Sequence, residues 1–302
     1  MFIKRIQVFP QYMLNAIRRV SSLLSLSVSF IKSYGLRAFV GKVKNHVLKR
    51  PPILLFQISK VGSTSLANTL TDMKLGVPIF HTHILNNLDA IYEDILKRNP
   101  NARDALSAVE QGKLVRKKID SGGYKTWNVI SIVRDPVARS ISAFFQGLHE
   151  TAPDVSKRID TDLVSAEELL EIFLERRIFN TGEWWFESQL RPVFNFDIFA
   201  VPFDKEQGYK IYEESWFRLL MMRLENMNEN IQPAMKQFLG IQKFNLVRHN
   251  VGEEKSYGKV YNAFLKLPLP PAYVTKMYST RTATHFYKEE ERERFIEYWT
   301  NK

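Results

Sequence analysis

The 302-residue chain contains no cysteine. It can therefore form no disulfide bond, and no thiolate can act in it as a nucleophile. The absence fits a reducing compartment, so we expect the protein in the cytoplasm.

Long hydrophobic runs are missing from the N-terminal region as well. The uncharged segment Val20–Ile31 has only 12 residues, and five of them are serine. Because a membrane-spanning helix needs about 20 mainly apolar residues, this segment does not predict one. We also expect no signal peptide, since the first basic cluster leads into no clean apolar core with a small-residue cleavage site.

Acidic residues are absent from the first 50 positions, which hold ten lysines and arginines. Residues 51–302 hold 33 basic and 32 acidic side chains, so almost all of the net charge of +11 belongs to residues 1–50. The overall basic charge is therefore no sign of nucleic-acid binding, and we expect no nucleic-acid partner.

Within residues 1–50, apolar side chains recur at helical spacing with arginine and lysine beside them, at Leu14, Ile17, Val20, Leu24, Val28 and Ile31. The pattern predicts a basic amphipathic helical arm. Such an arm either lies on an anionic membrane surface, which would place the protein at the inner face of the membrane, or packs on the rest of the chain. Residues 51–302 form the second predicted domain. The oligomeric state does not follow from the sequence.

The apolar run Ile53–Ile58 ends in a short loop with one glycine, and a helix is expected from Ser65. A strand that turns through a glycine into a helix makes an anion site, because the first helical N–H groups are unpaired and the helix dipole favours negative charge. Lys60 adds a positive charge, and Gly62 lets the backbone approach a ligand. The loop also supplies the candidate ligands Ser59, Ser63, Thr64 and Ser65.

The order of residues in this loop differs from that of the P-loop of nucleotide triphosphatases. That motif places lysine after its second glycine, in Gly-x-x-x-x-Gly-Lys-Ser/Thr, whereas here lysine precedes the only glycine. A helix capped by serine or threonine after a buried strand is the simpler alternative.

A second junction of the same kind starts with Trp127–Val133, which is short, apolar and β-branched and predicts a buried strand. Asp135 and Pro136 suit the cap and the first turn of a helix, which would place Ser142 about two turns along it. Arg134, at the end of the strand, can present a planar guanidinium to a phosphate. An ordinary strand-to-helix junction with a surface arginine is the alternative.

Together, the two motifs resemble those of sulfotransferases that use 3′-phosphoadenosine 5′-phosphosulfate (PAPS). The first resembles the 5′-phosphosulfate loop, with Ser59 where the family commonly has proline. The second resembles the 3′-phosphate motif, with serine eight positions after the arginine. The resemblance implies that Lys60 and the amides of residues 62–65 hold the 5′ end, while Arg134 and Ser142 hold the 3′-phosphate. It also implies that Lys60 stabilises the leaving oxygen and that no metal is needed.

Two histidines, His81 and His83, lie between these motifs and would share one face of a strand. A His-x-His pair is structural in many proteins and holds a metal in others, but no further cluster of metal-ligating residues lies nearby at suitable spacing. The segment is similar to one in glycosaminoglycan uronyl 2-O-sulfotransferases, where a histidine is the proposed general base. That resemblance implies His83 as the base, with His81 as its neighbour, and a glycan hydroxyl as the acceptor.

Two further segments hold candidate residues. Residues 181–187 are rich in aromatic and acidic side chains, which fits either core packing or a sugar-binding platform in which a glutamate is a further candidate base. The candidates there are Glu183, Trp184 and Glu187. Residues 278–288 resemble a segment of bacterial capsular polysaccharide synthesis proteins, which are sulfotransferase-like. There, Ser279 or Arg281 would complete the nucleotide site, or would form a helix cap and a surface arginine.

The alternation of strands and helices predicts an α/β fold with a P-loop-like parallel sheet flanked by helices, the sulfotransferase fold. Ligands of such sheets bind at the carboxyl ends of strands, where both motifs lie. We further expect helices over 86–118, 165–180 and 209–228, a strand over 196–201 and a polar loop over 149–162.

The resulting hypothesis is a PAPS-dependent sulfotransferase that acts on a hydroxyl group of a glycan or polysaccharide. One alternative is a P-loop nucleotide kinase, against which the order of the loop residues stands. The other is a non-catalytic, membrane-associated protein of polysaccharide assembly that keeps the fold.

Overall fold

The computed structural model describes residues 50–159, 163–176, 182–247 and 257–302. The chain divides into two units, Met1–Pro51 and Pro52–Lys302, and the fold below is that of the second. The basic arm predicted over residues 1–50 lies outside the described residues except for Arg50, so it stays a prediction. In the described ranges, no helix is long and apolar enough to cross a membrane.

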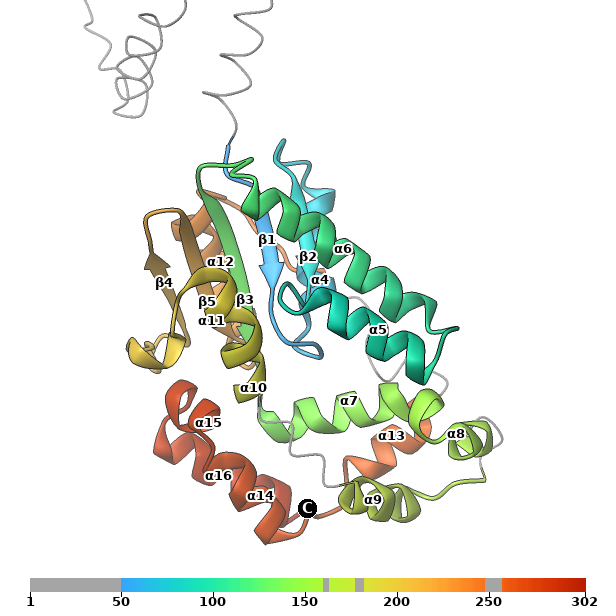
Figure 1. Ribbon diagram of the computed structural model, residues 1–302. Helices are drawn as coiled ribbons and strands as arrows, with labels where there is room; N and C mark the ends of the chain where they lie inside the picture. The colour runs from blue at the N-terminus through green and yellow to red at the C-terminus, as the bar shows by residue number, and fades with distance from the viewer. Residues whose placement is uncertain (1–49, 160–162, 177–181, 248–256) are drawn as a thin grey trace, which may run out of the picture. The chain divides into compact units, whose positions relative to one another are not determined.

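Five strands form a single sheet in the order β2-β1-β3-β5-β4 (Figure 1). The first four in this order run parallel, and the edge strand β4 runs antiparallel to β5. The mixed α/β fold with a mainly parallel sheet flanked by helices is therefore confirmed. The strands are β1 (Ile53–Phe56), β2 (Ile79–Thr82), β3 (Trp127–Val133), β4 (Tyr209–Glu213) and β5 (Phe217–Arg223).

The central strands are buried on both faces. All four residues of β1 are buried, as are all residues of β3 except Asn128. Parallel strands covered on both sides read as continuous apolar runs, which is why the sequence pattern of these two strands is unambiguous.

Helices connect the strands in the manner of a parallel sheet. α4 (Ser63–Asp72) follows β1 and starts two residues earlier than expected. α5 (Leu88–Arg98) and α6 (Arg103–Asp120) lead from β2 to β3, and they confirm the helices expected over 86–118. α12 (Met227–Leu239) follows β5 and packs on β5 and β4.

A second hydrophobic core, separate from the one around the sheet, lies among helices. Its centre is a cluster of rings in which Phe144, Phe145, Phe173 and Phe264 contact one another, with ring centroids 5.2–6.3 Å apart. In Figure 1 these helices lie beyond the arrowhead of β1. They are α7 (Pro136–Thr151), α8 (Pro153–Ile159), α9 (Ala166–Glu175), α13 (Gly258–Phe264), α14 (Pro271–Tyr278), α15 (Arg281–Phe286) and α16 (Glu289–Thr300).

The helix expected over residues 209–228 is wrong, because β4 and β5 occupy this segment as an antiparallel pair. Leucine and methionine at 219–222 favour a helix intrinsically. Here all four are fully buried and pair with β3 in the middle of the sheet, and burial on both faces outweighs the propensity.

The strand expected over residues 196–201 is also wrong. This segment contains the short 3-10 helix η2 (Ile198–Ala200). Asp197 caps it, with a carboxylate oxygen accepting a hydrogen bond from the Phe199 N–H at 2.9 Å. Just before it lie α10 (Glu183–Trp185), the π-helix η1 (Phe186–Leu190) and α11 (Arg191–Phe194).

The polar loop expected over residues 149–162 is wrong for most of its length. α7 continues to Thr151, and α8 begins at Pro153, where the missing N–H of proline costs no helical hydrogen bond. Residues 160–162 lie outside the described ranges. The helix expected over 165–180 is confirmed as α9 up to Glu175, and residues 177–181 are not described.

Candidate functional site

The carboxyl ends of the parallel strands bring the predicted donor-site residues to one edge of the sheet. The loop with Lys60 follows β1, His83 follows β2, and Arg134 follows β3 directly. The Leu224 N–H, just after β5, donates to the Val133 carbonyl oxygen at 2.8 Å. Ligands of open parallel sheets bind at this edge, so the arrangement defines a candidate site.

The loop after β1 adopts a backbone conformation that suits anion binding. Lys60 and Gly62 both have left-handed backbones, with φ of 70° and 77°. A Cβ atom at Gly62 would lie 2.9 Å from Cδ1 of Leu224, so any other residue would have to displace this side chain as well as adopt a positive φ. Gly62 is the N-cap of α4, and no side-chain cap hydrogen bond is made at this end of the helix. Gly62 and Thr64 are exposed, so the start of α4 is open to an anionic ligand.

A hydrogen bond joins the two predicted phosphate motifs. Nη1 of Arg134 donates to the carbonyl oxygen of Lys60 at 3.0 Å, across 74 positions of sequence. Asp135 has a structural role, because its Oδ1 accepts from the N–H groups of Val137 and Ala138 at 2.7 and 3.0 Å and caps α7. Arg134 is therefore held between the strand that precedes it and the cap that follows it.

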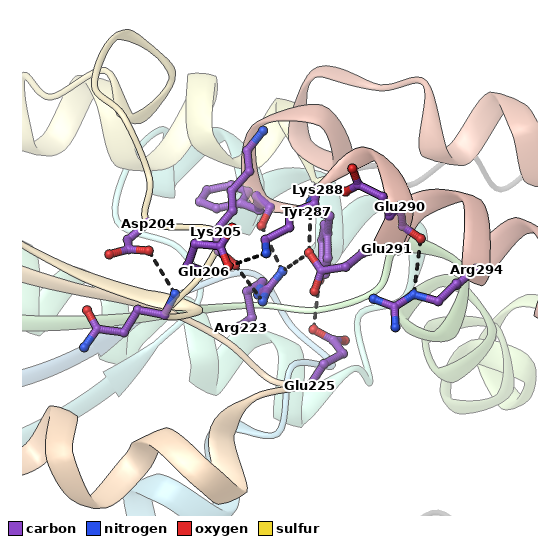
Figure 2. Close-up of polar contacts among 12 residues, drawn as sticks. Asp204, Lys205, Glu206, Arg223, Glu225, Tyr287, Lys288, Glu290, Glu291 and Arg294 are labelled. Carbon is purple, nitrogen blue, oxygen red and sulfur yellow. Dashed lines mark hydrogen bonds and ion pairs between the residues drawn. The ribbon is translucent and has the colours of Figure 1, made fainter.

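The N–H of Asp135 is held by a carboxylate that sequence analysis missed. It donates to Oε1 of Glu225 at 2.7 Å, and the Tyr287 hydroxyl donates to Oε2 of the same side chain at 2.9 Å (Figure 2). The other oxygen of Asp135, Oδ2, accepts from Nε1 of Trp299 at 3.0 Å. The C-terminal helices thus fix the start of α7. No local signal marks Glu225, since its partners are distant in sequence.

The two histidines differ in what their ring nitrogens contact. Nε2 of His81 lies 3.0 Å from the Ser63 hydroxyl oxygen. Nδ1 of His83 lies 2.8 Å from the carbonyl oxygen of Gln57, which can only accept a hydrogen bond. Nδ1 of His83 therefore carries the proton, and Nε2 is left as the basic nitrogen. The two rings meet edge to face with centroids 5.1 Å apart.

Both histidines are held in the neutral form at neutral pH. Burial lowers the pKa of His81 to about 4, with the nearby His83 acting in the same direction. Burial also lowers the pKa of His83; the Gln57 carbonyl opposes this effect, and the positive charge of Lys60 adds to it. The field of Lys60 therefore reaches the candidate base.

The segment from Gly182 to Leu190 supports the backbone around His83. Nε1 of Trp185 donates to the His83 carbonyl oxygen at 2.7 Å. Oε1 of Gln189 accepts from the N–H groups of Leu85 and Asn86 at 2.9 and 3.0 Å. These contacts join positions more than 100 residues apart, which is why sequence analysis missed both residues.

The predicted acceptor residues in this segment have different environments. Trp185 and Phe186 are core residues, whereas Trp184 is 50% exposed. Oε1 of Glu183 accepts from the Thr282 N–H at 3.3 Å. Glu187 pairs with Arg191 and with Arg281, at 2.9 and 3.0 Å.

The three remaining predicted donor residues are separate from the loop. Ser142 lies on α7 one turn after Ala138, and both are partly exposed, so this face of the helix is accessible. The Ser279 hydroxyl donates to the Lys276 carbonyl oxygen at the end of α14. Arg281 contacts Glu187, which places it beside the predicted acceptor residues. Within the described ranges, no hydrogen bond joins Ser142, Ser279 or Arg281 to the loop of Lys60.

In the part of the chain that the structure describes, no group of three or more histidine, aspartate or glutamate side chains could hold a metal ion.

Part of the chain matches the model of a known family. Residues 158–288 match the family described as "Putative capsular polysaccharide synthesis protein" (NKWYS). The match covers less than half of the chain; it includes Glu183, Glu187 and Arg281 but not Lys60 or Arg134. No curated protein matches the sequence, and no solved structure matches it.

Proposed function

We propose that this protein transfers a sulfuryl group from PAPS to a hydroxyl group of a glycan or polysaccharide. The observation that carries the proposal is the hydrogen bond from Arg134 to the Lys60 carbonyl oxygen, at the same sheet edge as His83. It brings two motifs that resemble the two phosphate sites of sulfotransferases into direct contact. The parallel order of β1 and β3, each followed by a helix, supports a P-loop-like sulfotransferase fold.

The residues at this edge fit a donor with an anionic group at each end. Lys60, the left-handed Gly62 and the uncapped start of α4 suit the 5′-phosphosulfate, together with the hydroxyls of Ser59, Ser63, Thr64 and Ser65. Among the described residues Arg134 uses one N–H donor, for the Lys60 carbonyl oxygen, and its other donors suit the 3′-phosphate, with Ser142 on the accessible face of the next helix.

When bound, the donor supplies a sulfuryl group, whose transfer forms an S–O bond to the acceptor oxygen and breaks the S–O bond to the bridging phosphate oxygen. Nε2 of His83 accepts the proton of the acceptor hydroxyl. The charge of Lys60 stabilises the negative charge that builds on the bridging oxygen. Positioning and electrostatic stabilisation are the main contributions of the protein, as in phosphoryl transfer.

His83 is a better candidate base than the alternatives. Its Nε2 has no hydrogen-bond partner among the described residues, while Nε2 of His81 faces the Ser63 hydroxyl. Its orientation is fixed on both sides, because the Gln57 carbonyl holds the ring and Trp185 holds the backbone. Glu183 and Glu187 already accept hydrogen bonds from the backbone of α15 and from arginines.

A glycan acceptor is supported by the family match. The matched residues 158–288 include the segment with Glu183, Trp184 and Glu187, which lies directly beside His83 through Trp185. We assign these three residues to the acceptor side of the site.

Calorimetry with adenosine 3′,5′-bisphosphate, with and without Mg²⁺, tests the proposal. Tight binding that does not need Mg²⁺ is the expected result. Binding of a nucleoside triphosphate that requires Mg²⁺ would indicate a kinase instead. Absence of any nucleotide binding would overturn the proposal in favour of a non-catalytic role in polysaccharide assembly.

A further inference from the structure

A cleft of about 380 Å³ lies between the segment 199–205 and helix α15. Phe199, Pro202 and Lys205 line one side. Arg281 and His285 line the other. All of these residues belong to the part of the chain that matches the polysaccharide synthesis family.

The cleft has a positive character. Lys205 Nζ donates to the Thr284 carbonyl oxygen at 2.8 Å, which holds the ammonium group at the rim. The Arg281 guanidinium lies over the Phe199 ring, 4.3 Å from its centroid. Arg281 also contacts Glu187 and Asp197, at 3.0 and 4.0 Å, but neither carboxylate lines the cleft.

The pKa of His285 is lowered by burial and by the positive charges near it. Burial, followed by the charges of Lys205 and Arg281, lowers the pKa of His285 to about 4, against a smaller opposing effect of Asp197. Its Nε2 atom is buried and has no hydrogen-bond partner among the described residues. An unsatisfied buried polar atom is uncommon in a folded protein, and His285 adds a polar side chain to the lining of the cleft.

Both walls of the cleft are fixed by the buried guanidinium of Arg223, which Figure 2 shows among Lys205, Tyr287 and Glu291. Nη2 of Arg223 donates to the Lys205 carbonyl oxygen at 3.2 Å, and Nη1 donates to the Phe286 carbonyl oxygen at 3.3 Å. Glu291 neutralises the charge with an Nη1–Oε2 contact of 2.6 Å. Arg223 is 1% exposed, so this clamp is part of the core and the cleft is formed before any ligand binds.

The cleft is connected to the proposed transfer site. Arg281 contacts Glu187, and the neighbouring Thr282 donates its N–H to Glu183. Both glutamates flank Trp185, which holds the His83 backbone. Pro202 gives the cleft an apolar surface beside these polar groups, a combination that suits a sugar ring.

We propose that this cleft binds a carboxylate-bearing sugar unit of an acidic polysaccharide. The inference rests on the proposed function in one respect, that the bound chain is the acceptor of the transfer. The acidic class of the sugar follows from the positive charges of Lys205 and Arg281.

Calorimetry of the full chain with two oligosaccharides of equal length tests the proposal: an oligogalacturonate, which carries carboxylates, and a neutral maltooligosaccharide. The acidic chain is expected to bind at least tenfold more tightly, and the difference should shrink as salt is added. Lys205→Gln and His285→Gln should each weaken binding of the acidic chain about tenfold, or about 1.4 kcal/mol. Lys266→Gln is the matched control, because Lys266 is exposed and does not line the cleft.

Equal affinity for the two oligosaccharides, or no effect of either cleft variant, would overturn the inference. Displacement of the acidic chain by an equal concentration of inorganic phosphate would show a general anion site and would also overturn it. Cooperative urea unfolding of the same variants confirms that they are folded. If the bisphosphate binds and the acidic chain does not, the inference fails alone; if only the acidic chain binds, the proposed sulfuryl transfer fails while the cleft assignment stands.

Discussion

Nδ1 of His83 lies 2.8 Å from the carbonyl oxygen of Gln57, the residue that follows the last residue of β1. This contact ties the candidate base to the strand that carries the donor loop. Because the carbonyl can only accept, the contact fixes one tautomer and leaves Nε2 available for a proton. The orientation of the base and the position of Lys60 are therefore set by the same strand end.

Replacing His83 with glutamine should abolish transfer and preserve donor binding. Glutamine can still donate to the Gln57 carbonyl, so the fold should tolerate the change. We expect kcat to fall by about a hundredfold or more, while calorimetry shows unchanged affinity for adenosine 3′,5′-bisphosphate. A matching loss in His81→Gln with an active His83→Gln would assign the base to His81.

The pH dependence of the wild type gives an independent measure of the same residue. A general base must be neutral to act, and the pKa of His83 is lowered. The acid limb of kcat/KM should therefore have its midpoint below about 6.5, the ordinary value for histidine. A midpoint above that value would contradict the assignment.

Replacing Lys60 with alanine should remove turnover without unfolding the protein. We expect a loss of about a hundredfold or more, since charge on the leaving oxygen is no longer stabilised. Lys74→Ala is the matched control, because Lys74 is an exposed lysine that also has a positive φ, 48°. Removal of the Lys60 charge should also raise the pKa of His83, measured by NMR of the ring protons. A fully active Lys60→Ala variant would remove Lys60 from the mechanism.

Arg134→Ala should separate the two phosphate sites. If Arg134 binds the 3′-phosphate, affinity for adenosine 3′,5′-bisphosphate should fall far more than affinity for adenosine 5′-phosphosulfate, which lacks that group. The side chain also donates to the Lys60 carbonyl oxygen, so a small loss for both ligands is expected. Equal large losses would show that Arg134 acts only by supporting the loop.

Gly62→Ala and Gly76→Ala form a matched pair, since both glycines have φ near +70°. A Cβ at Gly76 would meet nothing within 4 Å, so that variant should lose only about 1–2 kcal/mol of unfolding free energy through backbone strain. Gly62→Ala should lose more, because its Cβ would lie 2.9 Å from Leu224 Cδ1. Urea unfolding measures both, and in Leu224→Ala the extra loss at Gly62 should largely disappear. Equal losses at the two glycines would rule out the steric effect.

Local signals predicted much of the fold. The strand Trp127–Val133 has the bounds expected from its β-branched run, and Asp135 and Pro136 start α7 as a cap and a first-turn proline do. The helix predicted over residues 209–228 is wrong because leucine and methionine do not by themselves indicate a strand. Their state is decided by β3, which lies more than 80 residues away in sequence.

The candidate site was predictable only where its residues belong to a local motif. Lys60 and Arg134 each stand at a strand end followed by a helix, and such ends meet in a parallel sheet. The residues that hold His83 in place belong to no local motif, so they could not be predicted from the sequence. The contact of Trp185 with His83 spans 102 positions, and neither residue type indicates the other.

The stability of the protein should fall in acid, and His81 should account for part of the loss. The pKa of His81 is about 4 in the folded protein, against about 6.5 when unfolded, so the unfolded chain binds more protons between these values. The contribution of His81 to the free energy of unfolding is therefore fully present above about pH 6.5 and is lost as the pH falls towards 4. The loss amounts to at most about 3 kcal/mol. His81→Gln removes this titration and can still bond to Ser63. Urea unfolding at about pH 7 and about pH 4.5 should show a smaller acid loss in the variant than in the wild type. Parallel losses in the two proteins would mean that His81 is already able to take up a proton in the folded state.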